Sequence, residues 1–171
     1  NGFRTELINK IVGFNPHITV KPYESKYINP ARFNSPELNS ISKNLISSNT
    51  SEAIVINNNN SKGIILRGYK SNDFSKLSII NNKNFLGNKK NLKNNNISIG
   101  KELSFILDVK IGDNISLMSS SGIDTIIGSL PKQKVFKVVS LFESGLVDFD
   151  SNIVFMNLDI LEEFSNLKNS D

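Results

Sequence analysis

The chain contains no cysteine and no tryptophan, and its single histidine is His17. Without cysteine there can be no disulfide, no thiol nucleophile and no Cys-ligated zinc, and this absence suits an exported protein as well as a cytosolic one. A single histidine argues against a multi-histidine metal site and against a histidine-centred catalytic relay. The sequence nominates no nucleophile and no orienting partner for His17. We therefore expect no catalytic residue, no bound metal and no cofactor.

Strong charge and long apolar runs are also missing. The chain of 171 residues carries 20 basic and 16 acidic side chains, a formal charge of +4, and its lysines are scattered. Nucleic-acid binding needs a clustered basic face, so we expect no nucleic-acid partner, and only steeply salt-sensitive binding to oligonucleotides would support a single-strand-binding β-domain. No run approaches the roughly 20 apolar residues of a membrane-spanning helix, and no signal peptide is recognisable. Because the chain starts without methionine and ends in a helical pattern, we expect it to be a piece of a longer protein.

Apolar spacing and capping signals divide the first seventy residues into helices and strands. Ser35 and Pro36 form a typical helix start, an N-cap followed by proline at the first helical position. The predicted elements are a helix over 2–12, a strand over 18–20, a helix from 35 to 48 and a strand over 53–56. The last three predict a β-α-β unit with a parallel pair of strands.

The remainder of the chain mixes short strands and helices. The predicted elements are a strand over 63–69, a helix over 73–80, an Asn/Lys-rich surface excursion over 81–96, a helix over 101–107, strands over 114–118, 133–142 and 152–156, and a final helix capped by Asn157. This irregular order predicts an α+β fold. It also suggests two subdomains that meet near residue 70, one over residues 1–70 and a β-rich one over 71–171.

The connection between strands 114–118 and 133–142 stands out. Its twelve residues, 119–130, exceed the two to five of a tight hairpin, so we predict a long loop. The loop carries four apolar residues, Ile123, Ile126, Ile127 and Leu130. A projecting apolar loop, flanked here by Gly122 and Gly128, indicates recognition of a partner. Alternatively, the side chains of Ile126, Ile127 and Leu130 fold back onto the sheet as a satellite core.

Glu143, Asp148 and Asp150 form the main acidic cluster. Several carboxylate oxygens would suit a divalent cation, but the spacing matches no calcium-binding loop. Asp side chains also commonly accept hydrogen bonds from their own backbone in turns. We favour the turn interpretation. No phosphate-binding glycine motif is present.

Five segments, in one order over nearly the whole chain, match the motifs of a known family. They are 1–7, 97–103, 109–118, 136–146 and 148–158, which are similar to "MNGF--EL", "I-IG--LA", "VGDKI-L", "F-V-G-F-SGM" and "YDS--VF-PL". On these motifs the chain resembles the periplasmic domains of lipoprotein-releasing ABC-transporter permeases of the LolC/LolE type.

The resemblance implies a bacterial inner-membrane protein with this domain facing the periplasm. Its partners would be a periplasmic lipoprotein carrier chaperone, a second permease subunit, the lipoproteins themselves, and a cytoplasmic ATPase subunit reached through membrane helices. The domain itself would not be an enzyme. Such domains have a β-α-β "Porter" part, corresponding here to residues 1–70, and a mainly β "Sabre" part with a projecting hairpin loop. The second half of Porter is expected to be absent, since the chain ends at Asp171.

The family's carrier-capturing loop, called the hook, has the form "TPMG-(R)-P--" and falls on Thr125–Pro131, within a projecting region near 119–132. The expected partner-binding residues are Ile123, Thr125, Ile126, Ile127, Gly128, Ser129, Leu130 and Pro131. Ile126 stands where proline is common, which implies a less rigid tip because proline's fixed φ is lost. Ser129 stands where a basic residue is common, which removes a charge-assisted contact. The alternative is an efflux-type (macrolide exporter-like) or division-regulating permease that binds an adaptor protein.

Overall fold

The structure is a computed structural model that describes residues 18–21, 35–42, 44–58, 60–81, 83–126 and 128–167. For residues 123–125 and 129 it describes the backbone alone. The predicted helix over 2–12, together with His17 and Ile127, lies outside the described residues.

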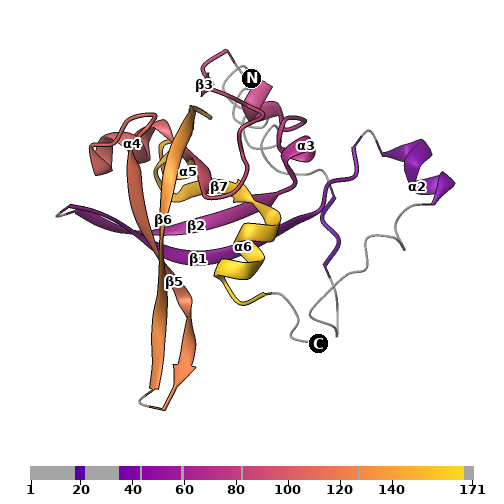
Figure 1. Ribbon diagram of the computed structural model, residues 1–171. Helices are drawn as coiled ribbons and strands as arrows, with labels where there is room; N and C mark the ends of the chain where they lie inside the picture. The colour runs from indigo at the N-terminus through magenta and orange to yellow at the C-terminus, as the bar shows by residue number, and fades with distance from the viewer. Residues whose placement is uncertain are drawn as a thin grey trace.

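A mixed β-sheet organises the fold (Figure 1). Its strands are β1 (Ser48–Asn57), β2 (Asn60–Tyr69), β3 (Leu86–Gly87), β4 (Asn96–Gly100), β5 (Asn114–Thr125), β6 (Gly128–Phe142) and β7 (Ile153–Asn157). They are ordered β3-β6-β4-β7-β2-β1-β5, and β6 also pairs with β5. Since β6 pairs with both β4 and β5, six strands close into a small barrel, and β3 extends β6 beyond it.

Alternation along these six strands explains the barrel core, because every second side chain of a strand faces the same side. The buried interior residues are Ala53, Val55, Ile64, Leu66, Ile97, Ile99, Ile115, Leu117, Phe136, Val138, Val154 and Met156. The helices α4 (Lys101–Leu107) and α6 (Leu158–Phe164) add Leu103, Leu107, Leu161 and Phe164 to this cluster.

A second apolar cluster involves the other face of β7. Phe155 packs there against Phe142, Phe74 and Tyr69, with ring centroids 4.8, 5.6 and 5.8 Å apart. Phe74 belongs to α3 (Ser71–Phe74), which is followed by the 3₁₀ helix η2 (Ser78–Asn81). The predicted single helix over 73–80 is therefore wrong in detail. Leu92 of the Asn/Lys-rich excursion is also buried in this cluster, so that excursion is partly ordered.

The local cap predictions are confirmed. The Ser35 hydroxyl accepts a hydrogen bond from the Leu38 amide (3.2 Å) at the start of α2 (Pro36–Ile41). The Asn157 side chain accepts from the amides of Asp159 (3.0 Å) and Ile160 at the start of α6. Both caps are local in sequence, which is why spacing alone found them.

The predicted β-α-β unit is wrong for the described residues. Residues 18–20 form no strand, and α2 ends at Ile41 although the prediction ran to 48. A run of only three residues, 18–20, can make few ladder hydrogen bonds, and the serines and asparagine that follow Ile41 are weak helix formers. β1 instead pairs antiparallel with β2 through a tight turn at Asn58, whose φ is 51°.

The α+β class is confirmed by this mixture of short helices and a mixed sheet. The subdomain boundary near residue 70 remains a prediction, although strands from both sides of it share the barrel. Within the described ranges no helix is long and apolar enough to cross a membrane.

Candidate functional site

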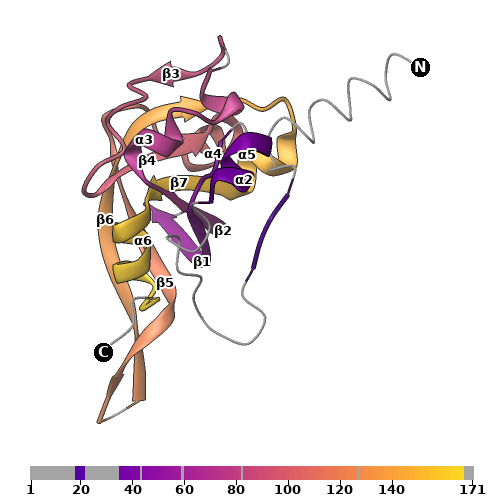
Figure 2. The same ribbon diagram turned by 90° about the vertical axis from the view of Figure 1, so that its right-hand side faces the viewer.

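The stretch predicted as a long loop is a two-stranded ribbon, so that prediction is wrong. β5 and β6 continue their antiparallel pairing through Gly122↔Pro131 and Ile123↔Leu130 to Thr125↔Gly128. The chain therefore reverses between the paired residues Thr125 and Gly128. Gly128 has a φ of +119°, a conformation that side-chain-bearing residues rarely adopt, which suits a tight reversal. Figures 1 and 2 show the ribbon running away from the barrel in both views.

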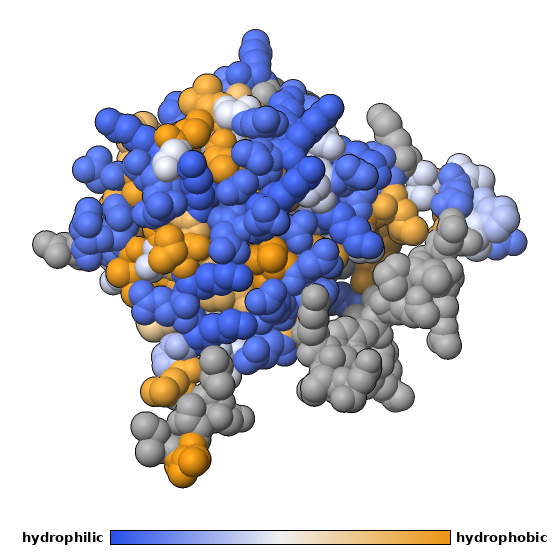
Figure 3. Space-filling view, viewed as in Figure 1, coloured by the Kyte–Doolittle hydropathy of each residue, from blue (hydrophilic) through white to orange (hydrophobic). Residues whose placement is uncertain are grey.

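The tip of the ribbon is apolar and exposed (Figure 3). The Ile126 side chain is fully exposed, at 107% of its reference area, and Leu130 is 52% exposed. Pro131 and Gly128 are also exposed. For Ile126 and Leu130 the satellite-core alternative is thus wrong, because neither side chain folds back onto the sheet.

For the other predicted hook residues within the description, the structure gives the position of the backbone only. Ile123, Thr125 and Ser129 lie in the paired strands of the ribbon, and their side chains lie outside the description. The tight register nonetheless brings the backbone of all the described hook residues into one hairpin end.

A serine bulge marks the base of the ribbon. Met118 pairs with Gln133 and Gly122 with Pro131, so the three serines 119–121 lie opposite Lys132 alone. The Ser120 hydroxyl donates to the Glu52 carbonyl of β1 (3.0 Å), and the Ser121 amide donates to the Ser119 hydroxyl (3.1 Å). Bulges bend a strand and increase its twist, so this is the point where β5 leaves the barrel wall.

A shallow groove lies beside this base. It has a volume of about 440 Å³ and is lined by ten residues: Glu52, Ala53, Ile54, Gly63, Ile64, Ile65, Met118, Ser119, Ser120 and Asn152. An added Cβ at Gly63 would meet nothing within 4 Å, so the missing side chain there helps to open the groove.

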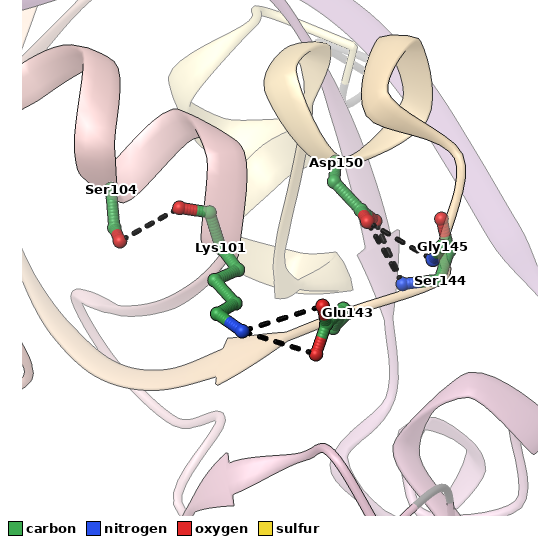
Figure 4. A network of polar contacts seen from close by, with 6 residues as sticks. All are labelled: Lys101, Ser104, Glu143, Ser144, Gly145 and Asp150. Carbon is green, nitrogen blue, oxygen red and sulfur yellow. Dashed lines mark hydrogen bonds and ion pairs between the residues drawn. The ribbon is translucent and has the colours of Figure 1, made fainter.

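Asp150 is the buried member of the acidic cluster, whereas Glu143 is partly exposed and Asp148 is exposed; Figure 4 shows the polar contacts of Asp150 and Glu143. The Asp150 carboxylate accepts hydrogen bonds from the amides of Ser144 (2.9 and 3.0 Å) and Gly145 (3.2 Å), while Lys101 lies 3.3 Å from Glu143. Burial raises the pKa of Asp150 above its ordinary value, and the hydrogen bonds from Ser144 and Gly145 oppose that rise. For Asp150 the turn interpretation is therefore correct. In the part of the chain that the structure describes, no group of three potential ligands is placed to hold a metal.

No family model matches the sequence. Over 101 residues, which are 58% of this chain, the sequence is 32% identical to the lipoprotein-releasing system transmembrane protein LolC of Xylella fastidiosa, in both strains Temecula1 and 9a5c. The resemblance to LolC is confirmed. The chain spans only 24% of the length of these curated relatives.

Among solved structures, the chain is similar to the extracellular domain of the noncanonic ABC-type transporter YknZ from Gram-positive bacteria. The TM-score is 0.45 at 12% identity, over 71% of this chain and 57% of that one.

Sequence reasoning missed the residues that meet the ribbon base. Lys132 and Lys134 lie on β6, and both reach Glu163 near the end of α6. Asn166, just beyond α6, donates to the Gly122 carbonyl. The only available signal was Asn166 itself, since asparagine after a helix end is typical of a left-handed cap.

Proposed function

We propose that this chain is the periplasmic domain of an inner-membrane ABC permease that releases lipoproteins and passes them to a periplasmic carrier chaperone. We further propose that the ribbon tip contacts the carrier. The observation that carries this proposal is the exposed apolar end of the ribbon at Ile126 and Leu130. The similarity to proteins named as lipoprotein-releasing components supports the choice of cargo.

The tip has the chemistry of an anchor for an apolar cavity. Fully burying one isoleucine or leucine side chain is worth roughly 1.5–3 kcal/mol, so the two together could supply a substantial part of a micromolar affinity. The facing edges of β5 and β6 pair with each other up to Thr125↔Gly128. When the ribbon enters a groove, only the backbone N–H and C=O groups on its outer edges therefore need hydrogen-bond partners from the other protein.

The domain acts in this scheme without catalysis. ATP hydrolysis takes place in a separate cytoplasmic subunit, and membrane helices and a second permease subunit connect it to this domain. At position 126 the isoleucine provides apolar area without proline's rigidity, and at 129 the serine provides no charge. The contact with the carrier is therefore mainly apolar.

Calorimetric titration with the purified lipoprotein carrier encoded in the same genome tests the proposal. Ile126→Asp and Leu130→Asp are each expected to weaken binding at least tenfold, because each would bring a charge into an apolar contact. Phe105→Asp is the matched control, since Phe105 is 67% exposed on α4, away from the ribbon. Unchanged affinity in both tip variants would exclude the ribbon as the carrier site. Binding of an adaptor protein in place of the carrier would favour the efflux-type or division-regulating alternative.

A further inference from the structure

Three contacts join the base of the ribbon to the last turn of α6. The Lys132 ammonium donates to the Glu163 carbonyl (2.8 Å), and Lys134 lies 3.8 Å from the Glu163 carboxylate. The Asn166 amide nitrogen donates to the Gly122 carbonyl (3.1 Å). Both strands of the ribbon are thus held, β5 at the end of the bulge and β6 directly opposite it. Figures 1 and 2 both show α6 beside the base of the ribbon.

The end of α6 has the geometry needed for this role. The Leu167 amide donates to the Glu162 carbonyl (2.8 Å), and Asn166 has a φ of 52°, which is the arrangement of a Schellman-type helix end. Asn166 is the left-handed residue at this helix end, and its side chain is the group that reaches the Gly122 carbonyl. The negative end of the helix dipole favours a cation at its last carbonyls, which is where Lys132 sits.

α6 is itself firmly seated on the barrel. Leu161 and Phe164 are buried, and the ring of Phe164 meets that of Phe136 edge-on at 5.5 Å. A Cβ at Gly68 of β2 would lie 3.0 Å from the Leu158 Cα, which shows how closely the helix approaches the sheet. The helix is therefore a fixed point against which the ribbon can be held.

We propose that Lys132, Lys134 and Asn166 are positioning residues that fix the direction of the ribbon relative to the barrel. We call these three side chains with Glu163 the α6 clamp. A two-stranded ribbon is marginal on its own, and the serine bulge interrupts its ladder where it leaves the barrel. The clamp spans that weak point, so it couples the direction of the tip to the position of α6.

The absence of cysteine allows a direct test by spin labelling. Labels at Ile126→Cys on the tip and Lys76→Cys on the barrel side report the tip-to-body distance by double electron–electron resonance. A narrow distribution is expected in the parent protein. The triple variant Lys132→Met, Lys134→Met, Asn166→Gly is expected to at least double its width. Glycine at 166 keeps the left-handed cap, so the helix end survives while the side-chain contact is lost.

The matched control removes two lysine side chains and one asparagine side chain at surface positions outside the clamp. Lys93→Met, Lys137→Met and Asn94→Gly delete two exposed lysines and an asparagine with a φ of 51°, outside the clamp. This variant should keep the parent's narrow distribution. A broad distribution in the parent, or an unchanged one in the clamp variant, would overturn the proposal. If the triple variant unfolds, the single variant Asn166→Gly replaces it in the test. An unchanged width of the distance distribution in Asn166→Gly would then overturn the proposal.

A consequence for affinity rests on the proposed function. If the tip binds the carrier, a ribbon free to swing must be ordered on binding, and the clamp variant should bind about three- to tenfold more weakly. The resonance experiment uses no carrier. A narrow, clamp-dependent distribution without carrier binding would therefore refute the proposed function and leave the clamp standing.

Discussion

Asp150 offers the sharpest test of how the barrel holds its helices. The carboxylate is 2% exposed and ties the backbone of Ser144 and Gly145, after β6, to α5 (Val147–Asn152). Replacing it with alanine leaves two amides without their acceptor, one of them in a buried contact. An unsatisfied buried donor costs about 1–3 kcal/mol, and we expect Asp150→Ala to lower the free energy of unfolding by about 3 kcal/mol in total.

Asp150→Asn separates the hydrogen bonds from the charge. One oxygen remains to accept from Ser144 or Gly145, so a loss of about 1–2 kcal/mol is expected. Asp148→Ala is the control, because that side chain is exposed on the same helix. Urea unfolding followed by circular dichroism measures all three variants. A change below about 0.5 kcal/mol in Asp150→Ala would refute the role given to the carboxylate.

The pH dependence has a defined sign. Burial raises the pKa of Asp150 in the folded protein above the unfolded value near 3.8. The folded state therefore binds this proton more tightly, and the associated stability is fully present below pH 3.8 and is lost as pH rises through the folded pKa. Asparagine does not titrate, so the stability advantage of the parent over Asp150→Asn should be larger near pH 4 than at pH 7. An advantage that grows with pH would mean that the amide hydrogen bonds outweigh burial.

Two glycine predictions follow from the space around each residue. A methyl group at Gly100 would collide with the Asp150 carbonyl, so Gly100→Ala should lower the free energy of unfolding in urea by about 1–3 kcal/mol. A methyl group at Gly63 would meet no atom within 4 Å, so Gly63→Ala should be close to neutral. Equal losses of stability in the two variants would contradict the close packing of α5 on β4. An added methyl group at Gly128 would also meet no neighbour, so the destabilisation of about 1 kcal/mol expected for Gly128→Ala comes from the φ of +119° alone. An unchanged melting temperature in this variant would contradict the tight turn at the ribbon tip.

Sequence reasoning succeeded where the signal was local. The caps at Ser35 and Asn157 and the helix over 101–107 depend on residues within one turn of each other, and they were predicted correctly. The closure of the barrel was not predicted, because the pairings of β6 with β4 and of β5 with β1 join distant segments. Alternation marks which side chains face inward, but it carries no information about which strands meet.

The ribbon was missed for a related physical reason. A strand is recognised by one buried face, but the ribbon residues whose exposure is described beyond Gly122 (Ile126, Gly128, Leu130 and Pro131) are all exposed, so the stretch was interpreted as a loop. The apolar character of the tip was nevertheless visible at Ile126 and Leu130, and both are exposed. Lys132 and Lys134 read as scattered surface charge, because their partner Glu163 is far away in sequence.

The architecture of the ribbon reconciles two demands on a tip that, as proposed, binds a partner. An exposed apolar end must stand clear of the body to enter a groove, yet a free two-stranded ribbon would lose binding energy to its own motion. At the bulge of Ser119–Ser121 strand β5 leaves the barrel, and the α6 clamp restores the stiffness that the ribbon loses there. Because the clamp's fixed point is the end of α6, whatever displaces this helix also redirects the tip.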